Sequence, residues 1–199
     1  MLSRAVESRI IEPDFLLLAY CSGYFPMADS KSGEIGWYSP DPRAIIEPEE
    51  LKIPRSLKLT LKKNPFEIRL DRRFEEVMRA CAEREDTWIS EEIVQSYLHL
   101  HQLGLAHSVE CWKNAELAGG LYGVAIWGAF FGESMFSRVR DASKVALVSL
   151  VNRLRDRGFE LLDTQFITPH LARFGAKEIP REEYLTRLKA ALRKNCQFI

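Results

Sequence analysis

The spacing of apolar residues switches along the chain between the period of a helix and the period of a strand. Helical spacing, with capping residues and terminal glycines, predicts helices over residues 14–21, 54–63, 72–84, 91–103, 143–157, 169–174 and 181–194. Short apolar or alternating runs predict strands over residues 44–46, 66–70, 106–113, 117–127, 129–136 and 159–166. The apolar stretch from Gly23 to Met27 is expected to be a loop.

The stretch from Gly128 to Gln165 predicts a strand, a loop, a helix and a second strand. Such a crossover suits an open mixed sheet with helices on its faces. The first strand carries Glu133 among apolar residues, and the second carries Asp163 and Gln165 two positions apart. Because alternate residues of a strand share a face, we expect these two side chains to lie together, about 6.6 Å apart along the strand. From the spacing alone, the pair fits a functional site and a strand end leaving the core equally well.

Composition and charge exclude several classes of protein. The chain has 199 residues, enough for one domain or two small ones, and a formal net charge of zero, so nothing attracts it as a whole to nucleic acid. Its four cysteines are scattered without a CxxC pair, which favours free thiols in a reducing compartment and argues against a zinc site. No apolar stretch approaches about 18 residues, so we expect a soluble cytoplasmic protein without a membrane segment.

The charge is locally uneven between Lys52 and Arg79, where nine basic residues accompany four acidic ones. A basic patch is what binding to a phosphate backbone requires. A run as diluted as this one is more often only a solvated face. Charge alone therefore leaves both interpretations open.

The order of predicted elements resembles the acetyltransferase-like (GNAT) fold, an α+β fold with a mixed sheet and flanking helices. In that fold the loop after a central strand receives the donor's phosphates, a role that Arg138 and Arg140 would fit here. The loop sequence, FSRVRDASK, has no glycine, whereas acetyl-CoA users carry glycines at this point. An acetyl-CoA-dependent N-acetyltransferase is therefore an alternative that this loop disfavours.

Seven sequence blocks follow one another at compatible spacing over residues Leu16 to Leu188. They read GYFPM, WYSPDPRA, TWI, AHSVECW, GGLYGVAIWGAFFGESMFSRVRDASKVAL, LLDTQ and GAKEIPREEYL. In this order they resemble the leucyl/phenylalanyl-tRNA–protein transferase family, and GESMFSR followed by ASK is a highly specific string. The resemblance implies a small N-terminal α/β domain over residues 1–50 and an acetyltransferase-like catalytic domain over residues 51–199.

The family resembled here moves leucine or phenylalanine, and less readily methionine, from aminoacyl-tRNA to the N-terminal arginine or lysine of a protein. The product's destabilising N-terminus marks that protein for N-degron degradation. Because an aminoacyl ester is already activated, the resemblance implies no cofactor, no metal and no covalent intermediate. It implies leucyl-tRNA, phenylalanyl-tRNA and acceptor proteins as partners, and we expect a monomer because no uncovered apolar helix demands a partner.

The resemblance also implies roles for individual residues. Gln165 matches the catalytic glutamine, Asp163 its partner acid, and Glu133 the acid of GESMFSR. The positions that map to an apolar pocket for the leucyl or phenylalanyl side chain are Leu121, Phe130, Met135 and Leu150. The residues expected to contact tRNA are Trp88, by stacking on the terminal adenine, and Arg55, Lys58, Lys62 and Lys63, by contacts to acceptor-stem phosphates.

Two positions depart from the family pattern. Met27 follows GYFP where an aromatic residue, usually tryptophan, is expected, so one wall of the adenine or side-chain site differs. Thr168 stands in TPH where the family often has Asn-Asp-His, which concerns contacts to the acceptor. Besides the N-acetyltransferase, a non-catalytic module that binds tRNA or N-degrons is a further alternative.

Overall fold

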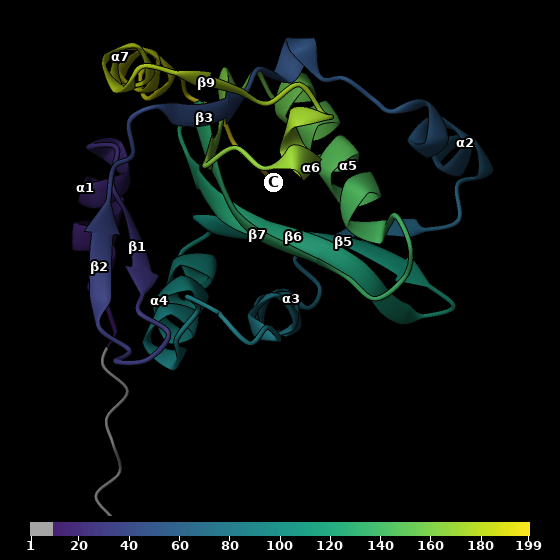
Figure 1. Cartoon of the computed structure of the whole chain (residues 1–199), viewed down its shortest axis with the longest axis horizontal. Helices are drawn as coiled ribbons and strands as arrows, with labels where there is room; N and C mark the ends of the chain where they lie inside the picture. Colours follow the sequence, from purple (N-terminus) through teal and green to yellow (C-terminus); the bar gives the residue numbers. More distant parts are fainter. Residues whose placement is uncertain (1–9) are drawn as a thin grey trace, which may run out of the picture.

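A computed structural model describes residues 10–199, and a seven-stranded mixed sheet forms its centre (Figure 1). In spatial order the strands are β4 (Glu67–Leu70), β5 (Ala106–Lys113), β6 (Glu116–Ile126), β7 (Ala129–Ser137), β8 (Leu161–Gln165), β3 (Arg43–Ile46) and β9 (Lys177–Ile179). Neighbouring strands are antiparallel except β7 and β8, which run parallel. A separate antiparallel hairpin consists of β1 (Phe25–Ala28) and β2 (Ile35–Tyr38).

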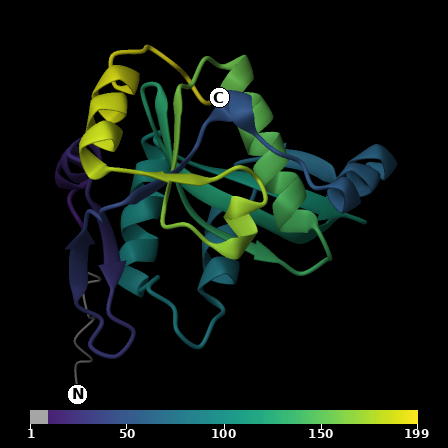
Figure 2. The ribbon, with the colours of Figure 1, turned by 45° about the horizontal axis from the view of Figure 1, so that its top comes forward.

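Helices cover both faces of the sheet, so the described chain has three layers (Figure 1). In chain order they are α1 (Pro13–Cys21), the 3₁₀ helix η1 (Pro48–Glu50), α2 (Arg55–Lys63), α3 (Phe74–Ala82), α4 (Glu91–Gln102), α5 (Ala142–Asp156), α6 (Pro169–Ala172) and α7 (Arg181–Ala191). Helix α5 lies on one face with α2 against it, while α3 and α4 lie on the other. Helix α7 lies beyond β9, at the end of the molecule that also holds α1 (Figure 2).

Two hydrophobic clusters fill the spaces between these layers. One lies on the α5 face and includes Leu147, Leu150 and Val151, whose helical spacing turns them toward the sheet. The other lies on the α3 and α4 face and includes Tyr97 and Val124. The sheet is therefore buried on both sides, which explains why the central strand β6 reads as an apolar run rather than as an alternating one.

The α+β class, the mixed sheet with flanking helices and the crossover from β7 through α5 to β8 are confirmed. The expected loop at Gly23 to Met27 is wrong, because this stretch forms most of β1 and pairs with β2. Strands β1, β2 and β9 have at most four residues, too few to show a period in the sequence. The domain boundary at residue 50 stays a prediction, and β3, which precedes it, lies inside the seven-stranded sheet.

The parallel pairing of β7 and β8 ends early. Only three residue pairs form it, and the last is Phe131 with Asp163. On its other side β7 contains a bulge, since Gly123 of β6 pairs with Gly132 and the preceding Tyr122 pairs with Ser134. Glu133 is thus the extra residue of the bulge. The bulge bends β7 at the point where its pairing with β8 stops, and a gap between the two strands follows.

Gly123 lies opposite this bulge and has no room for a side chain. A Cβ atom there would lie 2.3 Å from the carbonyl oxygen of Phe131 and 2.4 Å from the ring of Phe130. At Gly132, by contrast, the nearest atom to an added Cβ is the carbonyl oxygen of Asp163 at 3.5 Å, which is an ordinary contact. The close approach of β6 and β7 at the bulge therefore requires glycine at position 123.

We predict that Gly123→Ala lowers the free energy of unfolding by about 1–3 kcal/mol, because the methyl group must push β6 and β7 apart. Gly132→Ala is the matched control and should change the free energy of unfolding much less. Urea denaturation of the two variants and the wild type measures the difference. Equal losses in both variants would show that the bulge is not tightly packed against β6.

Candidate active site

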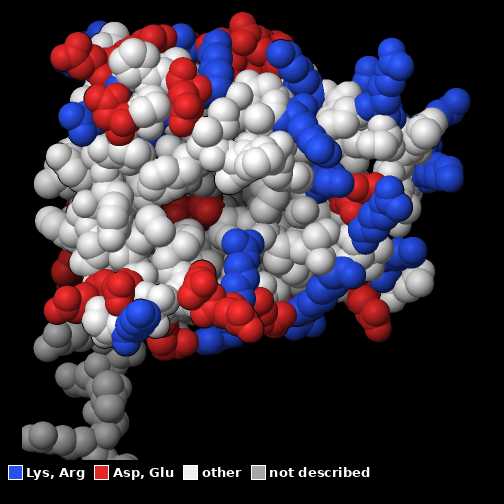
Figure 3. All heavy atoms as spheres, in the orientation of Figure 1, with Lys and Arg blue, Asp and Glu red and all other residues white. Residues whose placement is uncertain are grey.

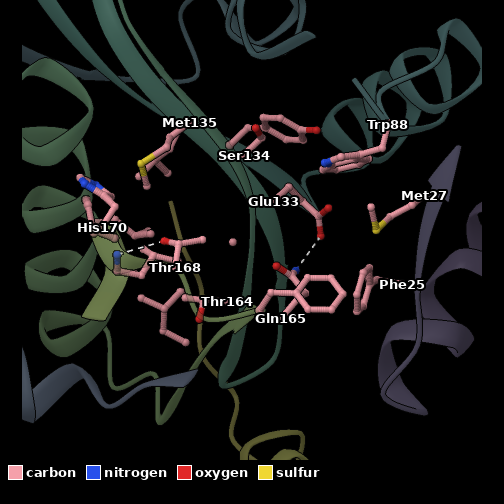
Figure 4. A pocket seen from close by; sticks show the side chains of 18 of the residues that line it. Phe25, Met27, Trp88, Glu133, Ser134, Met135, Thr164, Gln165, Thr168 and His170 are labelled. Carbon is pink, nitrogen blue, oxygen red and sulfur yellow. Dashed lines mark hydrogen bonds between the residues drawn. The ribbon is translucent and has the colours of Figure 1, made fainter. Parts of the chain in front are cut away.

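A pocket of about 270 Å³ opens where β7 and β8 separate (Figure 4). Its apolar walls come from the sheet, α5 and α6, and its polar groups include side chains of β6, of the ends of β7 and β8, and of α6. The lining residues are Phe25, Met27, Arg84, Trp88, Leu121, Tyr122, Gly132, Glu133, Ser134, Met135, Leu147, Leu150, Leu162, Thr164, Gln165, Phe166, Thr168, His170 and Leu171. Such a concave, mostly apolar site with a few polar groups is typical of a binding site for a small ligand.

Gln165 and Glu133 meet at the centre of this pocket. The side-chain amide of Gln165 donates from Nε2 to Glu133 Oε1 at 3.3 Å (Figure 4). The hydroxyl of Tyr20 donates to the same oxygen at 2.7 Å, and it also shares a hydrogen bond with the hydroxyl of Tyr97. Helices α1 and α4 thereby hold the acid of β7 in place from the opposite side of the sheet.

Burial raises the pKa of Glu133 from 4.5 to about 8. The hydrogen bond from Tyr20 acts against this rise, and the charge of Asp163 adds to it. Glu133 therefore exchanges its proton near neutral pH. A group with such a pKa suits general acid–base chemistry, because both protonation states are populated at the operating pH.

Asp163 and Gln165 do not share a face, so that expectation is wrong. Asp163 is fully buried away from the pocket, whereas Gln165 and its neighbour Thr164 line it. The cause is local: Thr164 is an extra residue opposite β3, since Ala44 pairs with Gln165 and the next residue of β3 pairs with Asp163. Gln165 also adopts a positive φ of 58°, which ends the alternation of the strand.

Asp163 lies at the centre of a buried polar network. Arg43 donates to its two carboxylate oxygens from Nε at 2.9 Å and Nη2 at 2.6 Å, and both side chains are at most 1% exposed. Tyr184 donates to Oδ2 at 2.7 Å, and the backbone N–H of Gln165 donates to Oδ1 at 2.9 Å. With four donors on two oxygens, Asp163 fixes the backbone of Gln165 rather than facing the pocket.

Three of the four residues expected in the side-chain pocket line it: Leu121, Met135 and Leu150. Phe130 does not line it, because it lies in the paired part of β7, before the strands separate, and packs on Phe198 at 5.2 Å between ring centroids. Three more apolar residues that were not expected in this wall also line it: Leu147, Leu162 and Leu171.

Trp88 lies at the other end of the pocket, beside Met27 and Phe25 (Figure 4). The backbone holds it there, since the N–H of Ala28 donates to the carbonyl of Trp88 at 3.1 Å. Met27 and Thr168, the two departures from the family pattern, both line the pocket. Thr168 also caps α6 by accepting the N–H of Leu171 at 3.1 Å.

The basic segment expected to contact tRNA divides into two parts. The side chains Arg55, Lys58, Lys62 and Lys63 are exposed on α2, away from the pocket lining, and form no ion pair within residues 10–199. They lie among the basic side chains at the edge of the molecule in Figure 3. Arg69 and Arg79, by contrast, pair with Glu67 and Glu75. The cations of α2 are therefore free to bind an external anion.

Two other features are absent from residues 10–199. No helix in this part of the chain is long and apolar enough to cross a membrane. No three His, Cys, Asp or Glu side chains among these residues are grouped so that they could hold a metal ion.

Comparison with known proteins identifies the family. A sequence model described as leucyl/phenylalanyl-tRNA protein transferase matches residues 45–189, and one for the N-terminal domain of the same transferase matches residues 9–41. The chain belongs to this family. The transferase of Herpetosiphon aurantiacus is 56% identical over 189 residues, which cover 94% of this chain and 98% of that protein. The transferase of Gloeobacter violaceus is 54% identical and covers 94% and 97%.

Among solved structures, L-PGS from Bacillus licheniformis aligns with 82% of this chain and 56% of its own, at 14% identity and a TM-score of 0.44. A C-terminal domain (DUF2156) of a putative lysylphosphatidylglycerol synthetase from Agrobacterium fabrum aligns with 93% of this chain and 58% of its own, at 9% identity and a TM-score of 0.43.

We predict that Asp163→Asn lowers the free energy of unfolding by about 3–5 kcal/mol, because it leaves the buried guanidinium of Arg43 without its charged partner. Glu183→Gln is the control, since it breaks a half-exposed ion pair with Arg187 and should lower stability far less. Chemical denaturation of both variants gives the two values. A similar small loss in both would show that the Arg43 pair does not hold the fold.

We predict that Glu133 makes the protein less stable as pH rises. Its folded pKa of about 8 lies above the unfolded value of 4.5, so the stability contributed by its proton is complete below pH 4.5 and is lost up to pH 8. Glu133→Gln cannot lose a proton, so the variant should gain stability relative to the wild type across this window, by at most about 1.4 kcal/mol per pH unit. Denaturation at pH 5, 6.5 and 8 checks the sign, and a constant difference would contradict it.

Proposed function

We propose that this chain transfers leucine or phenylalanine from aminoacyl-tRNA to the N-terminal arginine or lysine of acceptor proteins. Family membership supports the transferase activity and the use of tRNA and protein substrates. The observation that carries the chemistry is the contact of Gln165 with Glu133 at the centre of a pocket with one apolar wall. Three finer points belong to the same proposal. The acceptor residues are arginine and lysine, and the protein acts as a monomer. It acts in the cytoplasm, where charged tRNA is found.

The reaction exchanges one acyl bond for another. The neutral α-amine of the acceptor attacks the ester carbonyl of the aminoacyl-tRNA, a C–N bond forms, and the bond to the ribose oxygen breaks. The amine loses one proton and the leaving ribose oxygen gains one, so no cofactor is consumed. Since the ester is already activated, the protein has to align the reactants and support the proton transfers.

Gln165 is placed to orient the attacking amine. Its Nε2 is directed to Glu133, which leaves Oε1 free to accept a hydrogen from the amine. The backbone of Gln165 is fixed by Asp163, which is itself held by Arg43. In this arrangement Gln165 contacts the substrate and Asp163 acts as a positioning residue behind it.

Glu133 is placed to handle the proton that the amine loses. With a pKa of about 8, a fraction of its side chain is deprotonated at neutral pH and can accept a proton, which the amide of Gln165 cannot do. Tyr20 keeps the acid in one orientation through its hydrogen bond to Oε1. The same carboxylate is the negative group nearest to any cationic substrate that enters the pocket.

The donor fits the remaining surfaces. Leu121, Leu150 and Met135 form an apolar wall, and the flexible side chain of Met135 lets its shape adapt. This wall suits a side chain that is not branched at Cβ, such as that of leucine or phenylalanine. Trp88 gives a flat surface for the terminal adenine at the other end. The exposed cations of α2 supply contacts to backbone phosphates, which position tRNA without reading its sequence.

We predict that the wild type transfers labelled leucine and phenylalanine from charged tRNA to a peptide beginning with arginine. Gln165→Ala should lower kcat/KM by roughly 10²-fold, because one aligned polar contact to the reacting groups is lost. The affinity for tRNA should change little, since the phosphate contacts lie elsewhere. Gln102→Ala, an exposed change at the end of α4, is the control and should transfer normally.

Two results would contradict this proposal. A folded wild type that binds charged tRNA without transferring its amino acid would favour a non-catalytic binding module. Acetylation of the same peptide from acetyl-CoA in the absence of tRNA would favour the N-acetyltransferase. Full transfer by Gln165→Ala would leave the function standing and remove the role of this residue.

A further inference from the structure

Three buried polar atoms share an unusual property. Within residues 10–199 the buried side-chain nitrogen and oxygen atoms that have no hydrogen-bond partner are Tyr122 Oη, Thr164 Oγ1 and His170 Nε2. Tyr122 of β6 is far in the chain from Thr164 of β8 and His170 of α6, yet all three residues line the pocket between β7 and β8. Orphan atoms spread at random over the core would not gather around one cavity.

Such atoms are costly for a folded protein. A buried donor or acceptor that lacks a partner loses its hydrogen bonds to water without replacing them, and most buried polar groups are therefore paired. The rest of the site follows this rule, since Asp163 and Glu133 each have two or more donors. The unpaired atoms around the same pocket are best explained by a ligand that supplies the missing partners.

Tyr122 carries the argument furthest because it is fully buried and its ring is fixed. The ring meets those of Tyr97 and Phe74 edge to face, with centroids 5.9 Å and 6.0 Å away. Its hydroxyl therefore cannot turn to another partner in the core. Burial, with the charge of Glu133, raises the pKa of the Tyr122 hydroxyl well above its usual value, and the charge of Arg84 acts against this rise.

Thr164 and His170 lie across the pocket from Trp88 (Figure 4). Thr164 is the extra residue of β8 and immediately precedes Gln165 in the pocket lining. His170 packs its ring on Phe174 with centroids 5.2 Å apart, and its Nε2 is buried. Burial, with Lys144 and Arg173, lowers the pKa of His170, so a neutral imidazole can either donate or accept at Nε2.

We propose that Tyr122, Thr164 and His170 are donor-binding residues whose unpaired atoms hydrogen-bond to the aminoacyl-ribose end of charged tRNA. This end of the donor has an α-amino group, an ester carbonyl and a ribose hydroxyl close together, next to an apolar side chain. It thus offers several polar partners within one small volume beside the leucine-rich wall. The inference rests on the proposed function and assigns residues that the family motifs considered above did not single out.

The test removes single polar atoms without changing shape. Tyr122→Phe and Thr164→Val each delete one unpaired hydroxyl, so the melting temperature should stay equal or rise. Transfer from leucyl-tRNA should nevertheless fall in kcat/KM by roughly tenfold in each, which corresponds to about 1.4 kcal/mol of lost contact. His170→Phe should behave alike, and His170→Gln should restore part of the activity because its amide nitrogen can occupy the place of Nε2.

Two controls separate binding from folding. Tyr184→Phe removes a hydroxyl that is bonded to Asp163, so its melting temperature should fall and show that the assay detects one paired hydroxyl. Thr186→Val changes a threonine on the exposed part of α7 and should leave transfer unchanged. If Tyr122→Phe and Thr164→Val lower the melting temperature as Tyr184→Phe does, or transfer as fast as the wild type, the proposal is wrong.

A binding measurement keeps this inference distinct from the proposed function. A hydrolysis-resistant 3′-leucylamido-adenosine should raise the melting temperature of the wild type and should do so less in Tyr122→Phe, Thr164→Val and His170→Phe. This result would support the three contacts even if the wild type did not transfer leucine. Equal shifts in the wild type and all three variants would overturn the inference even if transfer by the wild type were normal.

Discussion

The buried ion pair between Arg43 and Asp163 is the interaction on which the rest of the site depends. It joins β3 to β8 across the sheet, and Tyr184 of α7 and the carbonyl of Gly23 complete its hydrogen bonds. The guanidinium also lies over the rings of Phe25 and Tyr184, at 4.7 Å and 4.5 Å from their centroids. One side-chain pair thus connects the N-terminal hairpin, the central sheet and the last helix, and it sets the backbone that presents Gln165.

The pocket exists because β7 and β8 pair over only three residue pairs and then separate. The bulge at Glu133 bends β7, and the extra Thr164 bends β8 against β3, at nearly the same level of the sheet. The gap between them exposes an apolar wall covered by α5 and a polar wall backed by Tyr20 and Tyr97. An aminoacyl ester needs both surfaces at once, since its side chain is apolar and its reacting atoms are polar.

The sequence was sufficient for the elements whose pattern is local and long. Helix α5 and strands β5 to β8 follow from the spacing of apolar residues, and the crossover follows from their order. It was insufficient at the end of β8, where the extra Thr164 reverses the alternation and takes Asp163 out of the pocket lining. It also could not show that β7 and β8 are still paired at Phe130, which therefore lies in the core. The roles of Arg43 and Tyr20 could not be predicted either. Their partners, Asp163 and Glu133, are 120 and 113 residues away in the chain, and no spacing rule connects residues so far apart.

The two carboxylates, Glu133 on β7 and Asp163 on β8, have separate roles in the chemistry and in the fold. The two carboxylate oxygens of Asp163 accept four hydrogen bonds, and the side chain is fully buried. Asp163 therefore stabilises the structure and has no oxygen free to bind a substrate. The hydrogen bonds to Glu133 come from the hydroxyl of Tyr20 and the amide of Gln165, which carry no charge. Burial therefore raises the pKa of Glu133 to about 8, close to neutral pH. A raised pKa in an acid weakens the fold at neutral pH. Asp163 thus holds the backbone of Gln165 in place, while Glu133 stays able to exchange a proton.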